Sequence, residues 1–159
     1  MRALTFALAL LSFPVVAFAV DLGRAAGSVT VDSTRIDLYY AYAVGNQKNE
    51  ITRRSDEVKV VITNKPLADS VKLDEIDLSF PGDVLGLVVS ITSDGKVSHV
   101  MVQHPIGTYD SGYVEDAHEY RFKSRRSEGG TVEGNASSRR VKTNTMTFSF
   151  DVEFAATVK

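Results

Sequence analysis

The sequence predicts an all-β protein, a single-domain antiparallel β-sandwich of about eight strands, with a closed or partly closed β-barrel as the alternative. After Val20, apolar and polar residues alternate with the period of two that is typical of strands. Turn-forming residues separate these runs at spacings of roughly 8 to 14 residues, and the strand–helix rhythm of a parallel sheet is absent. The composition, 43% hydrophobic and 24% charged without cysteine, is that of a globular domain rather than a disordered or disulfide-stapled chain.

The first residues have the pattern of a secretory signal peptide. Arg2 supplies a positive start, an apolar run follows, and Ala17-Phe18-Ala19 provides a small-x-small cleavage site. An uncleaved membrane anchor is the alternative, because the apolar run approaches the roughly 17 to 20 residues that span a bilayer. Pro14 and the cleavage site favour removal. We therefore expect a signal peptide at 1–19, one β-sandwich domain at 20–159, and a secreted or periplasmic location.

The first two strands are expected to form a hairpin. Ser28–Val31 and Arg35–Ala43 flank the turn residues Asp32-Ser33-Thr34. In the second of these strands the larger apolar side chains fall at every other position and should share one face. These side chains are Ile36, Leu38, Tyr40 and Tyr42.

The middle of the chain predicts one short strand, one short helix and one fully buried strand. Val58–Thr63 is closed by a proline, which cannot donate to a sheet ladder. Leu73–Ser79 is the one stretch that favours a short helix. Val84–Thr92 is apolar at both odd and even positions, which indicates a central strand covered from two sides.

The C-terminal half predicts two hairpins and a final aromatic strand. Asp94-Gly95 is a strong hairpin turn signal before a strand at Val97–Gln103. A long loop at 104–117 comes next, followed by strands at Glu119–Arg125 and Thr131–Ser137 that pair with one another. In the last strand the side chains of one parity are apolar and should face the core. These are Met146, Phe148, Phe150, Val152 and Phe154.

Several short motifs resemble an uncharacterised group of small secreted bacterial all-β proteins. Besides the signal peptide they are Gly27–Val31, Ala41–Ala43, Val60–Leu67, Asp94–Val97, His104-Pro105, Gly134 and Phe148–Val158. The resemblance implies export and a β-fold. It implies no catalytic residue, since no activity is assigned to the group.

The sequence contains no recognisable catalytic or cofactor constellation. Without cysteine, thiol catalysis, cysteine-bound zinc and iron–sulfur clusters are excluded. The histidines His99, His104 and His118 lack the paired spacing of metal ligands, and neither a Gly-x-Ser-x-Gly elbow nor a phosphate-binding glycine loop occurs. We expect no catalytic residue, no cofactor and no metal. The alternatives left open are a metal site completed by loop carboxylates and a calcium site in the acidic stretches around 69–83 and 110–119.

The charge balance limits the choice of partners. A formal net charge of −2 argues against general nucleic-acid binding, which requires a basic excess. Basic residues nevertheless gather between Arg121 and Lys142. They either protect a sheet edge against strand addition or bind an anionic surface such as lipid headgroups or polysaccharide.

The long loop at 104–117 is the best candidate binding segment. Loops of this length in compact domains are often functional, and tyrosines on an adaptable loop suit contacts with sugars or proteins. The candidate binding residues are His104, Tyr109, Asp110 and Tyr113, although the two rings could equally pin the loop to the sandwich.

The predicted function is therefore an exported, non-enzymatic binding or interaction domain. Its partner would be a protein, glycan or small ligand, and it would not be an integral membrane protein once the signal is removed. The alternative is a small apolar-ligand carrier with a β-barrel cavity, lined by Val84–Thr92, Tyr40 and Tyr42.

Overall fold

The computed structural model describes residues 20–47, 57–76, 80–112, 119–126 and 130–159, and it is all-β and antiparallel, as predicted. The predicted signal peptide lies outside these residues. Ten strands are described: β1 Arg24–Val31, β2 Thr34–Gln47, β3 Glu57–Thr63, β4 Gly86–Ile91, β5 Val97–His104, β6 Gly107–Asp110, β7 Tyr120–Arg126, β8 Thr131–Ser138, β9 Val141–Lys142 and β10 Thr147–Thr157.

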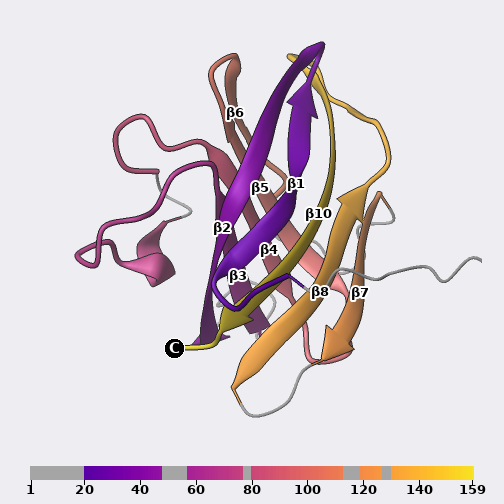
Figure 1. The fold of residues 1–159 in the computed structure, drawn as a ribbon. Helices are drawn as coiled ribbons and strands as arrows, with labels where there is room; N and C mark the ends of the chain where they lie inside the picture. The colour runs from indigo at the N-terminus through magenta and orange to yellow at the C-terminus, as the bar shows by residue number, and fades with distance from the viewer. Residues whose placement is uncertain (1–19, 48–56, 77–79, 113–118, 127–129) are drawn as a thin grey trace, which may run out of the picture.

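All ten strands belong to a single sheet. Its order is β6-β5-β4-β3-β2-β1-β10-β8-β7, with β9 paired to β10 outside this path. The sheet curls strongly into a half-barrel, as Figure 1 shows, so its two ends approach one another over the core. The hydroxyls of Tyr109 on β6 and Tyr120 on β7 lie 3.1 Å apart and link these ends directly. Opposite parts of one curled sheet thus enclose the core between them.

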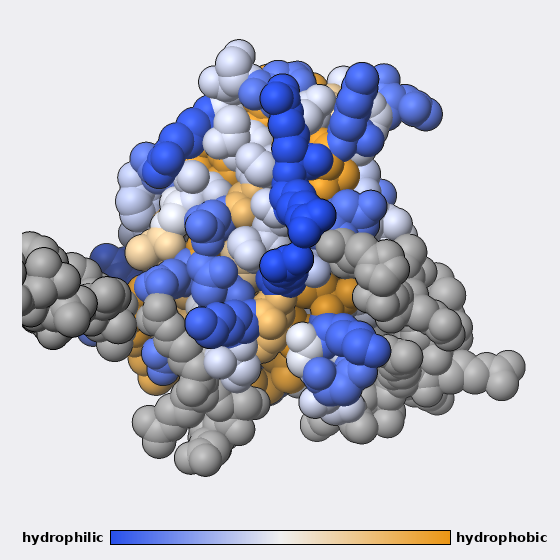
Figure 2. All heavy atoms as spheres, turned by 90° about the vertical axis from the view of Figure 1, so that its right-hand side faces the viewer, coloured by the Kyte–Doolittle hydropathy of each residue, from blue (hydrophilic) through white to orange (hydrophobic). Residues whose placement is uncertain are grey.

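The outer surface over β7 and β8 is mostly hydrophilic. Figure 2 looks at this side of the molecule and shows hydrophilic side chains with hydrophobic surface visible between them. On β8, Val132, Gly134 and Ala136 are buried, whereas the residues between them are partly exposed. This alternation is the pattern of a strand with one face on a core and one in water.

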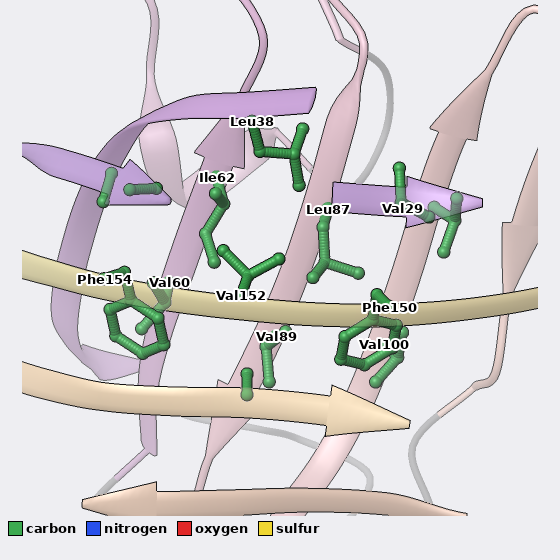
Figure 3. Packing of buried hydrophobic residues seen from close by; sticks show 14 of the residues in the cluster. Val29, Leu38, Val60, Ile62, Leu87, Val89, Val100, Phe150, Val152 and Phe154 are labelled. Carbon is green, nitrogen blue, oxygen red and sulfur yellow. The ribbon is translucent and has the colours of Figure 1, made fainter. Parts of the chain in front are cut away.

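The core face of β10 follows the predicted parity. Phe148, Phe150, Val152 and Phe154 are buried, and Asp151 between them is exposed. In Figure 3, side chains of β10 point towards valines, leucine and isoleucine of β3, β4 and β5 on the opposite part of the sheet. The aromatic strand therefore fills the space that the curled sheet encloses.

The predicted apolar face of β2 holds for Leu38 but is wrong for Tyr40 and Tyr42. Leu38 is buried in the main core, but the parity changes beyond it. Ala41 is buried in the main core, and Tyr42 packs against a second cluster on the opposite face. The pairing of β1 with β2 is irregular between residues 24 and 27, next to this change of parity. A shift of one residue moves every following side chain to the other face.

The central strand β4 is covered from two sides, as predicted. All six of its residues are buried. On the outer face, Val88 packs with Met101 of β5 and with Phe80 and Val84 from the connection between β3 and β4. This connection covers the outer face of β4, while the main core covers the inner face. Cover on both faces explains why β4 has apolar side chains at both odd and even positions.

In the described part of the predicted helix at Leu73–Ser79, the chain forms one 3-10 turn, Leu73–Glu75, and residues 77–79 lie outside the described part. The turn contains no buried residue. Ile76, immediately after it, is buried in the second cluster, and Leu73 packs against that cluster while partly buried.

The predicted long loop at 104–117 begins instead as a hairpin. His104 pairs with Gly107 across Pro105-Ile106, and β6 runs from Gly107 to Asp110 along the end of β5. Four residues are too short for their alternation to be distinguished from a loop. The Asp94-Gly95 turn and the β7–β8 pairing are both as predicted.

Candidate functional site

Tyr109 connects β6 to the core. Its ring centroid lies 4.6 Å from that of Phe148, and its hydroxyl lies 3.1 Å from that of Tyr120. Burial, and next the Tyr109 hydroxyl, raise the pKa of Tyr120 far above its usual range, so this hydroxyl is neutral at all physiological pH values. Tyr109 thus occupies a pinning position, whereas Tyr113 lies outside the described residues.

His104 is buried at the end of β5. Its Nδ1 accepts a hydrogen bond of 3.2 Å from the Ile106 amide, and its Nε2 has no partner among the described residues. Burial lowers the pKa of the imidazole, an effect opposed by the Thr34 backbone and the Asp32 carboxylate in the first hairpin turn. At 2% exposure this side chain does not reach a partner from solution.

Asp110 accepts two hydrogen bonds through the same oxygen. Oδ1 lies 2.9 Å from Nε2 of the buried His99 and accepts a bond of 2.7 Å from the Gly112 amide. His99 pairs in register with Ser90 of β4, and Ser90 pairs with Lys59 of β3. A row of polar side chains therefore crosses the apolar outer face of four strands.

The sequence analysis did not predict this polar row, although the proximity of Ser90 and His99 could have been predicted. The predicted pairing of Val84–Thr92 with Val97–Gln103 would have placed Ser90 beside His99, but Asp110 joins only because β6 exists. Serine, histidine and aspartate are the residue types of a hydrolytic triad. Ser90 and His99 are each only 1% exposed, so a nucleophile at Ser90 is closed to substrate, and the row consists of buried polar side chains that end at one exposed carboxylate.

A groove of about 290 Å³ lies where the two ends of the sheet face one another without pairing. One wall is the turn before β5 and the start of that strand, and the other wall is β7. The buried side chains of Val97 and Tyr120 lie at its base, and exposed cationic side chains line it. Its lining is Gly95, Lys96, Val97, Tyr120, Arg121, Phe122 and Lys123. We call this feature the seam groove.

The aromatic side chains of β7 hold this wall in place. Tyr120 stacks on Phe150 with ring centroids 6.1 Å apart, and Phe122 stacks on Phe154 at 5.9 Å. Arg121 and Lys123, of the opposite parity, are exposed on the outer face. Phe122 also lies against Gly134, where a Cβ atom would come 2.5 Å from the ring. The wall of the seam groove is therefore rigid on its core side and cationic on its outer side.

A second groove, of about 260 Å³, lies near the start of β1. Leu22, Gly23, Ala41, Ala43, Tyr42, Leu73, Thr157 and Lys159 line it. The large apolar side chain of Leu22 is 60% exposed. This groove is mostly apolar, and its volume, like that of the seam groove, falls below the roughly 300 to 1,000 Å³ of typical small-molecule sites.

Comparisons with protein-family models, with curated proteins and with solved structures returned no match. In the described ranges, no three histidine, aspartate or glutamate side chains come together as metal ligands would. Nor does any helix in those ranges have the length and apolarity needed to cross a membrane.

Proposed function

We propose that this protein is an exported, non-enzymatic binding domain and that the seam groove is its binding site. The observation that carries the proposal is the groove's composition, with Lys96, Arg121 and Lys123 exposed around an apolar base. Cations at the rim steer an anionic partner, and the apolar base supplies area to bury. Two of the four residues predicted from the sequence do not meet these conditions, because His104 is buried and Tyr109 is committed to Phe148 and Tyr120.

The alternative, an apolar-ligand carrier, has less support. A carrier needs an internal lumen, whereas side chains from both halves of the curled sheet fill the interior (Figure 3). Tyr42, proposed as a lumen residue, lies on the outer face, where its hydroxyl accepts a hydrogen bond of 2.9 Å from the Leu67 amide. The apolar groove near Leu22 is the remaining place for such a ligand.

Binding at the seam groove is tested with three anionic probes. They are an acidic peptide, an anionic polysaccharide such as alginate, and phosphatidylglycerol vesicles. At least one should bind, and the double variant Arg121→Glu/Lys123→Glu should weaken that binding by at least about tenfold. Arg35→Glu/Lys72→Glu makes the same change in net charge at exposed sites on other elements and should leave binding within about twofold.

The proposal fails if none of the probes binds, or if both double variants weaken binding equally.

Export is tested separately. The intact mass of the protein isolated from its native source should correspond to a chain that begins at Val20, since the pattern at 17–19 is a cleavage site. A full-length species extracted only with detergent contradicts this prediction.

A further inference from the structure

The outer edge of β7, which borders the seam groove, carries main-chain groups without a partner strand in the described part of the sheet. The Arg139 amide donates a hydrogen bond of 3.0 Å to the Glu119 carbonyl, which identifies 119 and 139 as a hydrogen-bonded pair of the antiparallel ladder. Such pairs alternate along a ladder, so Arg121 and Lys123 also direct their main-chain groups at β8. The amides and carbonyls of Phe122 and Ser124 therefore point away from β8, and β7 is the last strand of the described sheet on this side.

This edge is regular over a length that suits a short extended segment. The pairing with β8 runs without interruption from Tyr120 to Ser124, and a register irregularity follows before Arg126. A bulge of this kind ends regular pairing. The edge thus offers a defined site for a few residues rather than a long open template.

The charges on the edge distinguish among extended partners. Arg121 and Lys123 stand at alternate positions on the outer face of β7, and Lys96 lies across the groove. Directly opposed like charges destabilise a strand pair, so a second copy of β7 is repelled, which is the usual protective effect of an edge cation. The same side chains attract acidic residues at alternate positions of an incoming strand.

We propose that the occupant of the seam groove is an acidic extended segment of a partner protein, which adds to β7 as a further strand. This inference rests on the proposed function and specifies its ligand. Carboxylates at every second residue face Arg121 and Lys123, and the residues between them face the apolar base formed by Val97 and Tyr120. Main-chain hydrogen bonds to Phe122 and Ser124 supply affinity, and the alternating side chains supply specificity.

The test compares a peptide of alternating glutamate and valine with the same peptide N-methylated at alternate amides. N-methylation keeps every charge but removes main-chain donors, so it should weaken binding by at least about tenfold. In the complex, hydrogen exchange at the Phe122 and Ser124 amides should slow at least about tenfold, because these amides gain acceptors. The Arg121 and Lys123 amides, which already donate to β8, should change less and serve as internal controls.

Two outcomes overturn the strand-addition proposal while the binding function stands. One is equal binding of both peptides without new protection at Phe122 and Ser124, which indicates contact through charge alone. The other is binding of the polysaccharide or the vesicles, but not of the peptide, in a manner that depends on Arg121 and Lys123. If no probe binds at all, the proposed function itself fails.

Discussion

Gly27 lies where β1 passes very close to β10, and replacing it with alanine tests this contact. An added Cβ would come 2.6 Å from the Val152 Cα atom and closer still to the Asp151 carbonyl oxygen. Both atoms belong to the backbone of β10, which pairs with β1 along its whole length, so neither can move without displacing the strand. The φ of Gly27, 152°, is also a conformation that L-residues rarely adopt.

The cost of Gly27→Ala has two parts. The conformational part is about 1 to 3 kcal/mol, and overpacking adds about 1 to 3 kcal/mol. Alanine also restricts the unfolded chain more than glycine does, and this effect offsets about 0.4 to 1 kcal/mol of the cost. We therefore expect a loss of about 2 to 5 kcal/mol in the free energy of unfolding, measured by equilibrium denaturation in urea.

Gly95→Ala is the matched control. Gly95 also has a positive φ, 78°, but a Cβ there would meet nothing within 4 Å. Only the conformational cost of about 1 to 2 kcal/mol applies, reduced by the same effect on the unfolded chain. If the two variants lose equal stability, the close approach of β1 to β10 does not exist and the register assigned to these strands is wrong.

Two further predictions concern the core and pH. Phe150→Ala should cost about 3 to 5 kcal/mol through lost burial and a cavity, whereas Ser149→Ala should change stability by less than about 0.5 kcal/mol; equal effects in chemical denaturation would contradict the parity of β10. Since burial holds the pKa of His104 below its ordinary 6.5, the unfolded chain binds the proton more readily, and stability should fall as the pH drops below about 6.5. His104→Gln should flatten this dependence between pH 7 and pH 5 in urea unfolding, and an unchanged slope would show that His104 does not cause it.

The sequence by itself determined those features that depend on neighbours along the chain. Alternation at 148–154 predicted which side chains of β10 are buried, because the period of two is a property of each strand. Asp94-Gly95 predicted a hairpin because a turn conformation depends on the residues within it. The apolar character of β4 at both parities predicted cover on two faces, although it did not identify what supplies the second cover.

Tertiary structure decided which distant residues meet. His99 reaches Asp110 because β6 pairs with β5, and no local pattern distinguishes a four-residue strand from a loop. Tyr42 faces outward because the parity of β2 changes beside an irregularity in its pairing with β1. The seam groove exists because the curled sheet brings β7 opposite the start of β5 without pairing them. Twist and curl accumulate over the whole sheet, so the relative position of its two ends depends on all the strands together. The sequence of either end strand alone does not determine it.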